Sequence, residues 1–344
     1  MNEGDAELRK LLRMIIAYFV HLETRFHSWF VESSPFSAYS YDQKNAREFA
    51  NVLWHETMLA DRERIEKYRE AIRRGVRKGD VVVDIGAGTG ILSFFAAESA
   101  AKVYAVEHAD VIEIAETIRA DNAIDNVEFV KCNSRDFDLP QRADVIVHEQ
   151  IGGENPLSEN MIANLLDARR RLLKPGGRII PAKFEIFIEP IQLKGDHVIP
   201  FLWEMKIGNF DFRSTAPIAR PMSGRRIAGH ERRTISVAMV EHCLCEPKPV
   251  MSFDLETMEE GDIPRHVRYE NVAARDGRID GLCIYFKAIF DDDLAIETTP
   301  TGHVTNWAML LYRMEQTWIA RGETVAYELA IESILNDDAW AFTW

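Results

Sequence analysis

The sequence Val-Val-Val-Asp-Ile-Gly-Ala-Gly-Thr-Gly, at residues 81–90, decides the fold of this chain. An apolar run from Ile91 to Ala97 follows it directly, so the order predicts a buried strand, a glycine turn and a helix. Gly86, Gly88 and Gly90 lack a Cβ, which lets backbone N–H groups approach a ligand at the positive N-terminus of that helix. The stretch therefore predicts a ligand site at the end of a strand.

The spacing of the glycines narrows the kind of ligand. A dinucleotide motif, G-x-G-x-x-G, requires glycine at the position of Ile91, and a triphosphate loop requires a Lys-Ser/Thr pair that this loop lacks. Asp84 instead precedes the first glycine by two residues, and the motif resembles the S-adenosylmethionine loop of class I methyltransferases. This resemblance implies that Asp84 and the three glycines bind that cofactor.

Glu107 ends a second buried run, residues 102–107. An acid at the end of the second strand of a βαβ unit can accept hydrogen bonds from both ribose hydroxyls. The alternative is that Glu107 caps the helix that begins near Asp110. We favour the cofactor role, because an acid, three glycines and a second acid occur within one strand–helix–strand pattern.

Composition limits the class of protein. The chain has 344 residues, enough for two domains, and its formal net charge of −14 argues against a nucleic-acid phosphate surface and suits a cationic substrate. No apolar run reaches membrane-spanning length and no signal layout opens the chain, so we expect a cytoplasmic protein without a membrane partner. We also expect reduced cysteines and no metal, because zinc-site spacing is absent from Cys132, Cys243, Cys245 and Cys283.

Periodicity divides the chain into three parts. Apolar residues at three- and four-residue steps predict an amphipathic helix within 1–38, and a second helical stretch covers 42–73. Alternating strands and helices predict a doubly wound parallel sheet in a domain at 39–181, and short strands predict a barrel or sandwich at 182–344. The predicted strands are 81–83, 102–107, 127–131, 144–149, 178–180, 185–188, 234–238 and 282–290; the predicted helices of the sheet domain are 91–97, 111–120 and 160–173, with a turn at 174–177.

The end of the strand at 144–149 is expected to face the reacting groups, because ligands bind at the carboxyl ends of strands in open α/β sheets. Glu149 occupies this end, where a buried carboxylate needs a positive partner. The loop that follows adds Glu154 and Glu159. Two carboxylates on one loop suit a guanidinium, whose planar fork of donors they match bidentately.

Together, the glycine motif, the loop from His148 to Met161 and the β-rich second half resemble the protein arginine N-methyltransferase family over residues 39–344. The resemblance implies an α/β fold: a Rossmann-like sheet of the class I methyltransferases, then a β-barrel domain, with N-terminal helices. In that family two acids hold the target guanidinium, and they match Glu149 and Glu159 here. This loop is one residue longer and has Gln-Ile-Gly-Gly at 150–153 in place of Trp-Met-Gly, so Glu154 is the alternative second acid; we favour Glu159.

The resemblance extends to other site residues. The segment from His55 to Arg64 is similar to the family helix whose arginine binds the methionine carboxylate of the cofactor, which by position is Arg64. It implies that Met58 and Met161 line the methyl-transfer site. The remaining positions that the resemblance implies are Tyr39 and Tyr41, which close over the cofactor, and Ser134 and Arg135, which contact its adenine although the family usually has acids there.

Near the C-terminus, Thr305-Asn306-Trp307 resembles the Thr-His-Trp loop that completes the arginine pocket in the family. Asn306 replaces the histidine, and an amide does not titrate near neutral pH, so a proton-relay role at this position is in doubt. Trp307 can still stack on a guanidinium. Residues 201–221 occupy the place of the family's dimerisation arm, which implies a homodimer.

Three functions follow from these expectations. The first, which we favour, is methylation of an arginine within a protein, with S-adenosylmethionine as the donor. The second is methylation of free L-arginine or a related small guanidine, whose carboxylate would need a partner such as Arg220, Arg225 or Arg226. The third is a cofactor-binding scaffold without turnover. The acceptor of the released proton stays open among His55, Asp61 and water.

Overall fold

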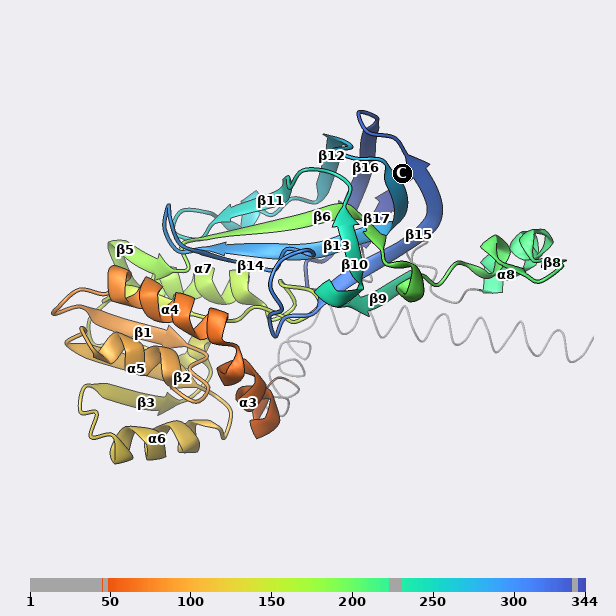
Figure 1. Ribbon diagram of the computed structural model, residues 1–344. Helices are drawn as coiled ribbons and strands as arrows, with labels where there is room; N and C mark the ends of the chain where they lie inside the picture. The colour runs from red at the N-terminus through yellow and green to blue at the C-terminus, as the bar shows by residue number, and fades with distance from the viewer. Residues whose placement is uncertain (1–44, 46–48, 223–230, 336–339) are drawn as a thin grey trace, which may run out of the picture. The chain divides into compact units, whose positions relative to one another are not determined.

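The computed structural model describes residue 45 and residues 49–222, 231–335 and 340–344 (Figure 1). The chain divides into two compact units, Met1–Val52 and Leu53–Trp344, and the description below concerns the second. The helix predicted within residues 1–38, as well as Tyr39, Tyr41, Arg225 and Arg226, lies outside the described residues. Among the described helices, none combines the length and the apolar composition needed to span a bilayer.

Five parallel strands form the sheet of the first domain, in the order β3-β2-β1-β4-β5. The order reverses between β1 and β4, which is where ligands bind in such sheets. The strands are β1 (Val81–Ile85), β2 (Lys102–Glu107), β3 (Val127–Lys131), β4 (Ala143–His148) and β5 (Leu173–Ile180). The helices are α3 (Val52–Ala60), α4 (Arg62–Gly75), α5 (Ile91–Ala97), α6 (Ile112–Asp121), the short η1 (Ser134–Asp136) and α7 (Met161–Leu172).

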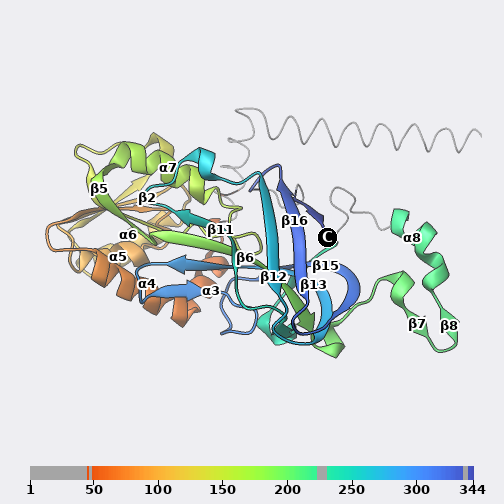
Figure 2. The same ribbon diagram turned by 90° about the horizontal axis from the view of Figure 1, so that it is seen from above.

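Helices cover both faces of this sheet (Figures 1 and 2). Val82 and Val145 pack in one core cluster with residues of α4 and α5. Val83 and Ile146 pack in another cluster with residues of α7. Successive side chains of a strand point to opposite faces, so these continuous apolar strands are buried on both sides and confirm the predicted doubly wound sheet.

Several elements differ from the sequence prediction. The strand predicted at 234–238 ends at Ile235, and Val237–Met239 form a short helix, η5, instead. The helical stretch at 42–73 is interrupted at Asp61, because the Asp61 side chain accepts a hydrogen bond from the backbone N–H of Arg64 and starts a new helix there. The turn predicted at 174–177 is included in β5. The pairing of β4 with β5 is irregular there, because Ala143 pairs with Leu173 whereas Val145 pairs with Arg178. Within this irregularity Gly176 has a φ of 72°.

The second half is a β domain, as predicted, and its described strands form two main antiparallel sheets that contribute to one apolar core. The seven-stranded sheet contains β6 (Lys183–Leu193), β9 (Glu231–Ile235), β10 (Val240–Cys243), β11 (Pro249–Asp254), β13 (Gly277–Ile289), β14 (Ala295–Glu297) and β15 (Met309–Ile319). The three-stranded sheet contains β12 (His266–Val272), β16 (Thr324–Ile331) and β17 (Trp340–Thr343). The short helices are η2 (Gly195–His197), η5 (Val237–Met239) and η6 (Glu260–Asp262).

An arm leaves the β domain between β6 and β9 (Figure 2). It contains η3 (Leu202–Glu204), the hairpin of β7 (Lys206–Ile207) and β8 (Phe210–Asp211), η4 (Arg213–Thr215) and α8 (Ala216–Met222). Side chains tie its base to β15, where Trp203 Nε1 donates to Glu315 at 3.0 Å. The segment at 201–221 thus extends from the β domain, and its role in dimerisation stays a prediction.

Candidate active site

The turn between β1 and α5 depends on glycine for two reasons. Gly88 and Gly90 have φ values of 55° and 83°, which residues with a side chain rarely adopt. A Cβ at Gly88 would lie 3.2 Å from Cε1 of His55, and one at Gly90 would lie 2.8 Å from Cζ of Phe129. The sequence therefore keeps the backbone of this turn bare beside the buried His55.

Two buried acids flank the glycine turn. The Glu107 carboxylate accepts hydrogen bonds from the backbone N–H groups of Gly88 at 2.9 Å and Ala109 at 2.7 Å, so it holds the turn and the residues before α6 together. Its oxygens retain lone pairs for further donors. Asp84 Oδ2 accepts a hydrogen bond from Ser93 Oγ at 2.6 Å.

The second oxygen of Asp84 bears directly on cofactor binding. Asp84 Oδ1 is buried and has no hydrogen-bond partner among the described residues. Burial raises the pKa of Asp84 to about 7, and the hydrogen bond from Ser93 opposes this effect. A buried acceptor without a partner, beside a bare backbone turn, fits a ligand that donates hydrogen bonds. S-adenosylmethionine is such a ligand through its amino and hydroxyl groups.

A guanidinium is held at the carboxyl end of β4. Glu149 forms an ion pair with Arg64 of α4, and the two side chains are only 11% and 10% exposed. The guanidinium carbon of Arg64 lies 4.8 Å from the centre of the Trp307 ring, within cation–π distance. Burial lowers the pKa of Arg64, and the nearby negative charges of Asp61 and Glu159 oppose this shift. Glu149 and Trp307 therefore contact one buried cation, and the charges of Asp61 and Glu159 act on it.

The loop that carries Trp307 is fixed to the first domain by two hydrogen bonds. Trp307 Nε1 donates to the carbonyl oxygen of Ile151 at 3.1 Å. The backbone N–H of Asn306 donates to Asp61 Oδ2 at 2.8 Å. Asp61 Oδ1 is the oxygen that caps α4 at Arg64, so one carboxylate joins the start of this helix to the loop.

The remaining candidates separate into different surroundings. Glu154 is exposed and accepts a hydrogen bond from Thr234 Oγ1 of β9, so the structure places it on the β domain rather than beside Arg64. Met58 is partly exposed on α3, whereas Met161 is fully buried in the core at the start of α7. Their roles at the methyl-transfer site stay predictions. Among the described residues, no group of His, Cys, Asp or Glu is arranged to hold a metal ion.

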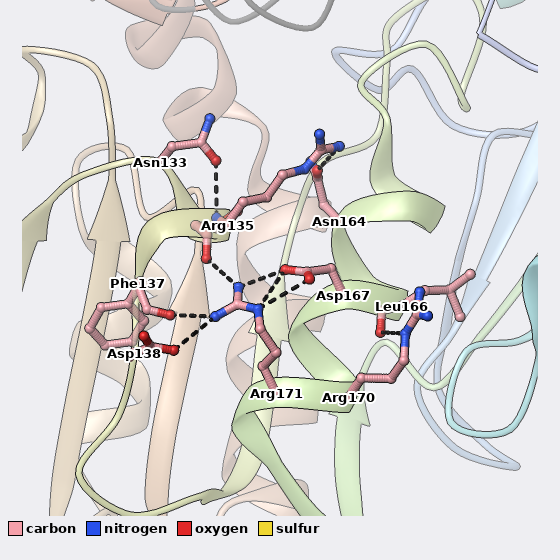
Figure 3. Close-up of polar contacts among 10 residues, drawn as sticks. Asn133, Arg135, Phe137, Asp138, Asn164, Leu166, Asp167, Arg170 and Arg171 are labelled. Atoms are coloured by element: carbon pink, nitrogen blue, oxygen red, sulfur yellow. Dashed lines mark hydrogen bonds and ion pairs between the residues drawn. The ribbon is translucent and has the colours of Figure 1, made fainter. Parts of the chain in front are cut away.

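The turn after β3, where the resemblance implies adenine contact, is braced by α7 (Figure 3). Arg171 donates to the carbonyl oxygens of Ser134 at 2.9 Å and Phe137 at 2.6 Å. Asp167, one helical turn earlier, holds the same guanidinium, with its Oδ2 at 2.6 Å from Arg171 Nη2. Arg135 itself is exposed and donates to Asn164 Oδ1 at 3.1 Å.

Sequence reasoning missed this brace, although Asp167 and Arg171 have the i, i+4 spacing of a helical ion pair. It also missed Gln150, whose side chain lies 3.6 Å from the Cβ position of Gly86 and whose buried Oε1 has no partner among the described residues. The unusual Gln-Ile-Gly-Gly segment was the available signal. A side chain that covers a cofactor glycine is a further candidate for binding.

We expect cofactor affinity to depend on the Arg171 brace. Arg171→Leu removes the donors to two turn carbonyls, which should raise the Kd of S-adenosylhomocysteine about tenfold. Turnover at saturating cofactor should change little, because the reacting groups are untouched. Arg170→Leu is the matched control, since Arg170 is exposed and, among the described residues, donates only to Leu166 of its own helix, at 3.1 Å. Calorimetric Kd values that are equal for both variants would contradict the role of the brace.

Comparisons with known proteins bear on this site. A family model described as "Methyltransferase domain" matches residues 76–199. Probable protein arginine N-methyltransferase 6 of Arabidopsis thaliana is 34% identical over 234 residues, which cover 66% of this chain and 52% of that relative. Protein arginine N-methyltransferase 6 of Danio rerio is 30% identical over 300 residues, which cover 82% of each chain.

Solved structures share the fold. The PRMT1 enzyme–prozyme heterotetrameric complex of Trypanosoma brucei with AdoHcy gives a TM-score of 0.67 at 24% identity, covering 82% of this chain and 88% of that one. Protein arginine methyltransferase 10 of Arabidopsis thaliana gives 0.65 at 23% identity, covering 83% and 89%. Together with the alignment to the Danio rerio relative, these findings show that the chain belongs to the protein arginine N-methyltransferase family and uses S-adenosylmethionine as its cofactor.

Proposed function

We propose that the protein methylates an arginine within a protein segment, and that Glu149 and Glu159 hold the target guanidinium. The observation that carries this proposal is the setting of Arg64, which is paired with Glu149, close to the charge of Glu159 and covered by Trp307. Carboxylates and an aromatic face are the groups that recognise a planar cation. A site built around one guanidinium has the chemistry to bind another.

Arg64 can serve the cofactor while it contacts Glu149. A guanidinium has five N–H donors, and the ion pair with Glu149 uses one of its terminal nitrogens. The other donors are available for the methionine carboxylate of the cofactor, as the family resemblance implies. In this arrangement Arg64 neutralises part of the charge of Glu149 and links the two substrates of the reaction.

The acids would also activate the target. Arginine is a poor nucleophile, because its pKa above about 12 keeps it protonated and its lone pairs are delocalised. When bound, S-adenosylmethionine supplies an electrophilic methyl group. Carboxylates bonded to the guanidinium draw its charge toward the nitrogens they contact and leave more electron density on the nitrogen that is methylated. The methylated product must then release one proton, and His55, Asp61 and water are the candidate acceptors.

Two observations favour arginine in a protein over free arginine. The formal net charge of −14 suits a basic protein segment. Of the arginines considered for the carboxylate of a free amino acid, Arg220 is in the structure already paired with Glu315 at 2.7 Å and lies over the Trp203 ring in the arm. Arg220 is therefore engaged away from the acids that hold Arg64.

The substrate class can be tested directly. The enzyme is incubated with labelled S-adenosylmethionine and, in parallel, with a glycine/arginine-rich peptide, the same peptide with lysine in place of arginine, and free L-arginine. We expect label only in the arginine peptide. Transfer to free arginine alone would replace the proposed substrate by a small guanidine. If the protein binds S-adenosylhomocysteine but transfers label to none of the acceptors, the result would support a cofactor-binding scaffold without turnover.

Isosteric substitutions test the two acids. We expect Glu149→Gln and Glu159→Gln each to lower kcat by about a hundredfold or more, because each removes a charge that faces the guanidinium. Glu154→Gln is the matched control from the same loop and should retain most of its kcat at saturating peptide, since Glu154 bonds to Thr234 rather than to Arg64. The Kd of S-adenosylhomocysteine must be measured for each variant, because Glu149 also contacts Arg64. A strong loss in Glu154→Gln with an active Glu159→Gln would reverse the assignment.

We also propose that the arm at 201–221 makes the protein a homodimer. Its apolar side chains are exposed, with Ile207 59%, Phe210 75% and Ile218 69% accessible. Such residues gather where another surface covers them. Light scattering should give twice the chain mass of 39.4 kDa, and Phe210→Asp should reduce it to one chain. The control Trp318→Asp changes a residue of β15 that is 69% exposed, and it should leave the mass doubled. A wild-type protein of single-chain mass at micromolar concentration would contradict this proposal.

A further inference from the structure

The β domain contains a pocket of about 300 Å³ beside the loop that carries Trp307. This volume corresponds to roughly ten water molecules in the liquid. Val304, at 78% exposure, is an exposed apolar residue of this pocket. The apolar part of the lining comes from β9, η5 and the loop before β15, and consists of Ile235, Val237, Met239, Val304, Trp307 and Met309.

The pocket and the guanidinium site share a wall. Trp307 lines the pocket, and its ring also lies 4.8 Å from the guanidinium carbon of Arg64. The hydrogen bond from Trp307 Nε1 to the carbonyl oxygen of Ile151 fixes the ring beside Arg64. Because the same residue borders both, a chain that places an arginine beside Glu149 brings the neighbouring residues of that arginine close to the pocket.

We propose that this pocket binds an apolar side chain of the substrate, from a residue next to the target arginine. The inference rests on the proposed function, methylation of arginine in a protein. Among the described lining residues there is no carboxylate, ammonium or guanidinium, and the titratable one, His303, is exposed. Burial of a charged side chain here would lack a partner and would be costly, whereas burial of an apolar one is favourable.

Glu154 lies at the edge of the pocket and contributes to the charge that the substrate meets there. Thr234 lines the pocket and donates its hydroxyl hydrogen bond to Glu154. The exposed carboxylate therefore stands at the edge of the apolar surface, where it repels acidic segments and attracts basic ones. The substrate that fits is a basic segment with one apolar residue beside its arginine.

The experiment uses peptides that share one basic sequence with a single arginine. They differ only in the residue directly before or directly after this arginine. That residue is leucine, phenylalanine, glycine or lysine. The wild-type enzyme is assayed with each peptide for kcat/KM. For the position that reaches the pocket, we expect leucine or phenylalanine to exceed both glycine and lysine about tenfold.

A pocket-filling variant assigns this preference to the pocket. Ser236 lines it and is exposed, so Ser236→Trp should reduce the ratio of leucine to glycine peptides to near one. Ser252→Trp makes the same change at an exposed position of β11 and should keep the wild-type ratio. Because the preference is first measured on the wild-type enzyme, the proposal can fail even where a variant does not fold.

The possible outcomes distinguish failure of the pocket proposal from failure of the proposed methylation of arginine in a protein. Equal kcat/KM for leucine, glycine and lysine peptides, or a leucine preference that survives Ser236→Trp, would overturn the pocket and leave the methylation of protein arginine intact. Methylation of free arginine with none of the peptides modified would overturn both.

Discussion

The buried guanidinium of Arg64 is the constraint on which the site depends. A charge with this little exposure must be paired, because burial penalises its charged form. The cation and its two partners come from three separate parts of the sequence: α4 provides the arginine, the end of β4 provides Glu149, and the loop before β15 provides Trp307. The contacts of one cation therefore bring α4, the acidic loop and the β domain together.

The backbone arrangement follows from the same requirement. The parallel sheet ends its β1 and β4 strands side by side, which sets the glycine turn next to Glu149. The break at Asp61 starts α4 at the position that turns Arg64 toward these strand ends. On the other side, α7 braces the turn after β3 through Arg171. The contacts of Arg64 and Arg171 join separate elements, so the site depends on the assembled domain rather than on one motif.

The parallel-sheet domain was largely predictable, because its strands are continuous apolar runs bounded by glycine and polar residues. The predicted ends of β2 and β3 agree with the structure, and β4 ends one residue earlier, at His148. The helix break was missed because Asp61 reads as part of one polar face until its side chain is seen to cap the next helix. Contacts such as Thr234 with Glu154, 80 residues apart, depend on how the β domain meets the loop, which no local pattern specifies.

The hydrogen bond between Asp61 and residue 306 involves a backbone N–H, so it is indifferent to the side chain carried there. Any residue other than proline keeps the tether. An imidazole and an amide at this position would therefore hold the loop equally well. The side chain at residue 306 can therefore change the chemistry of the arginine pocket without changing the position of the loop backbone.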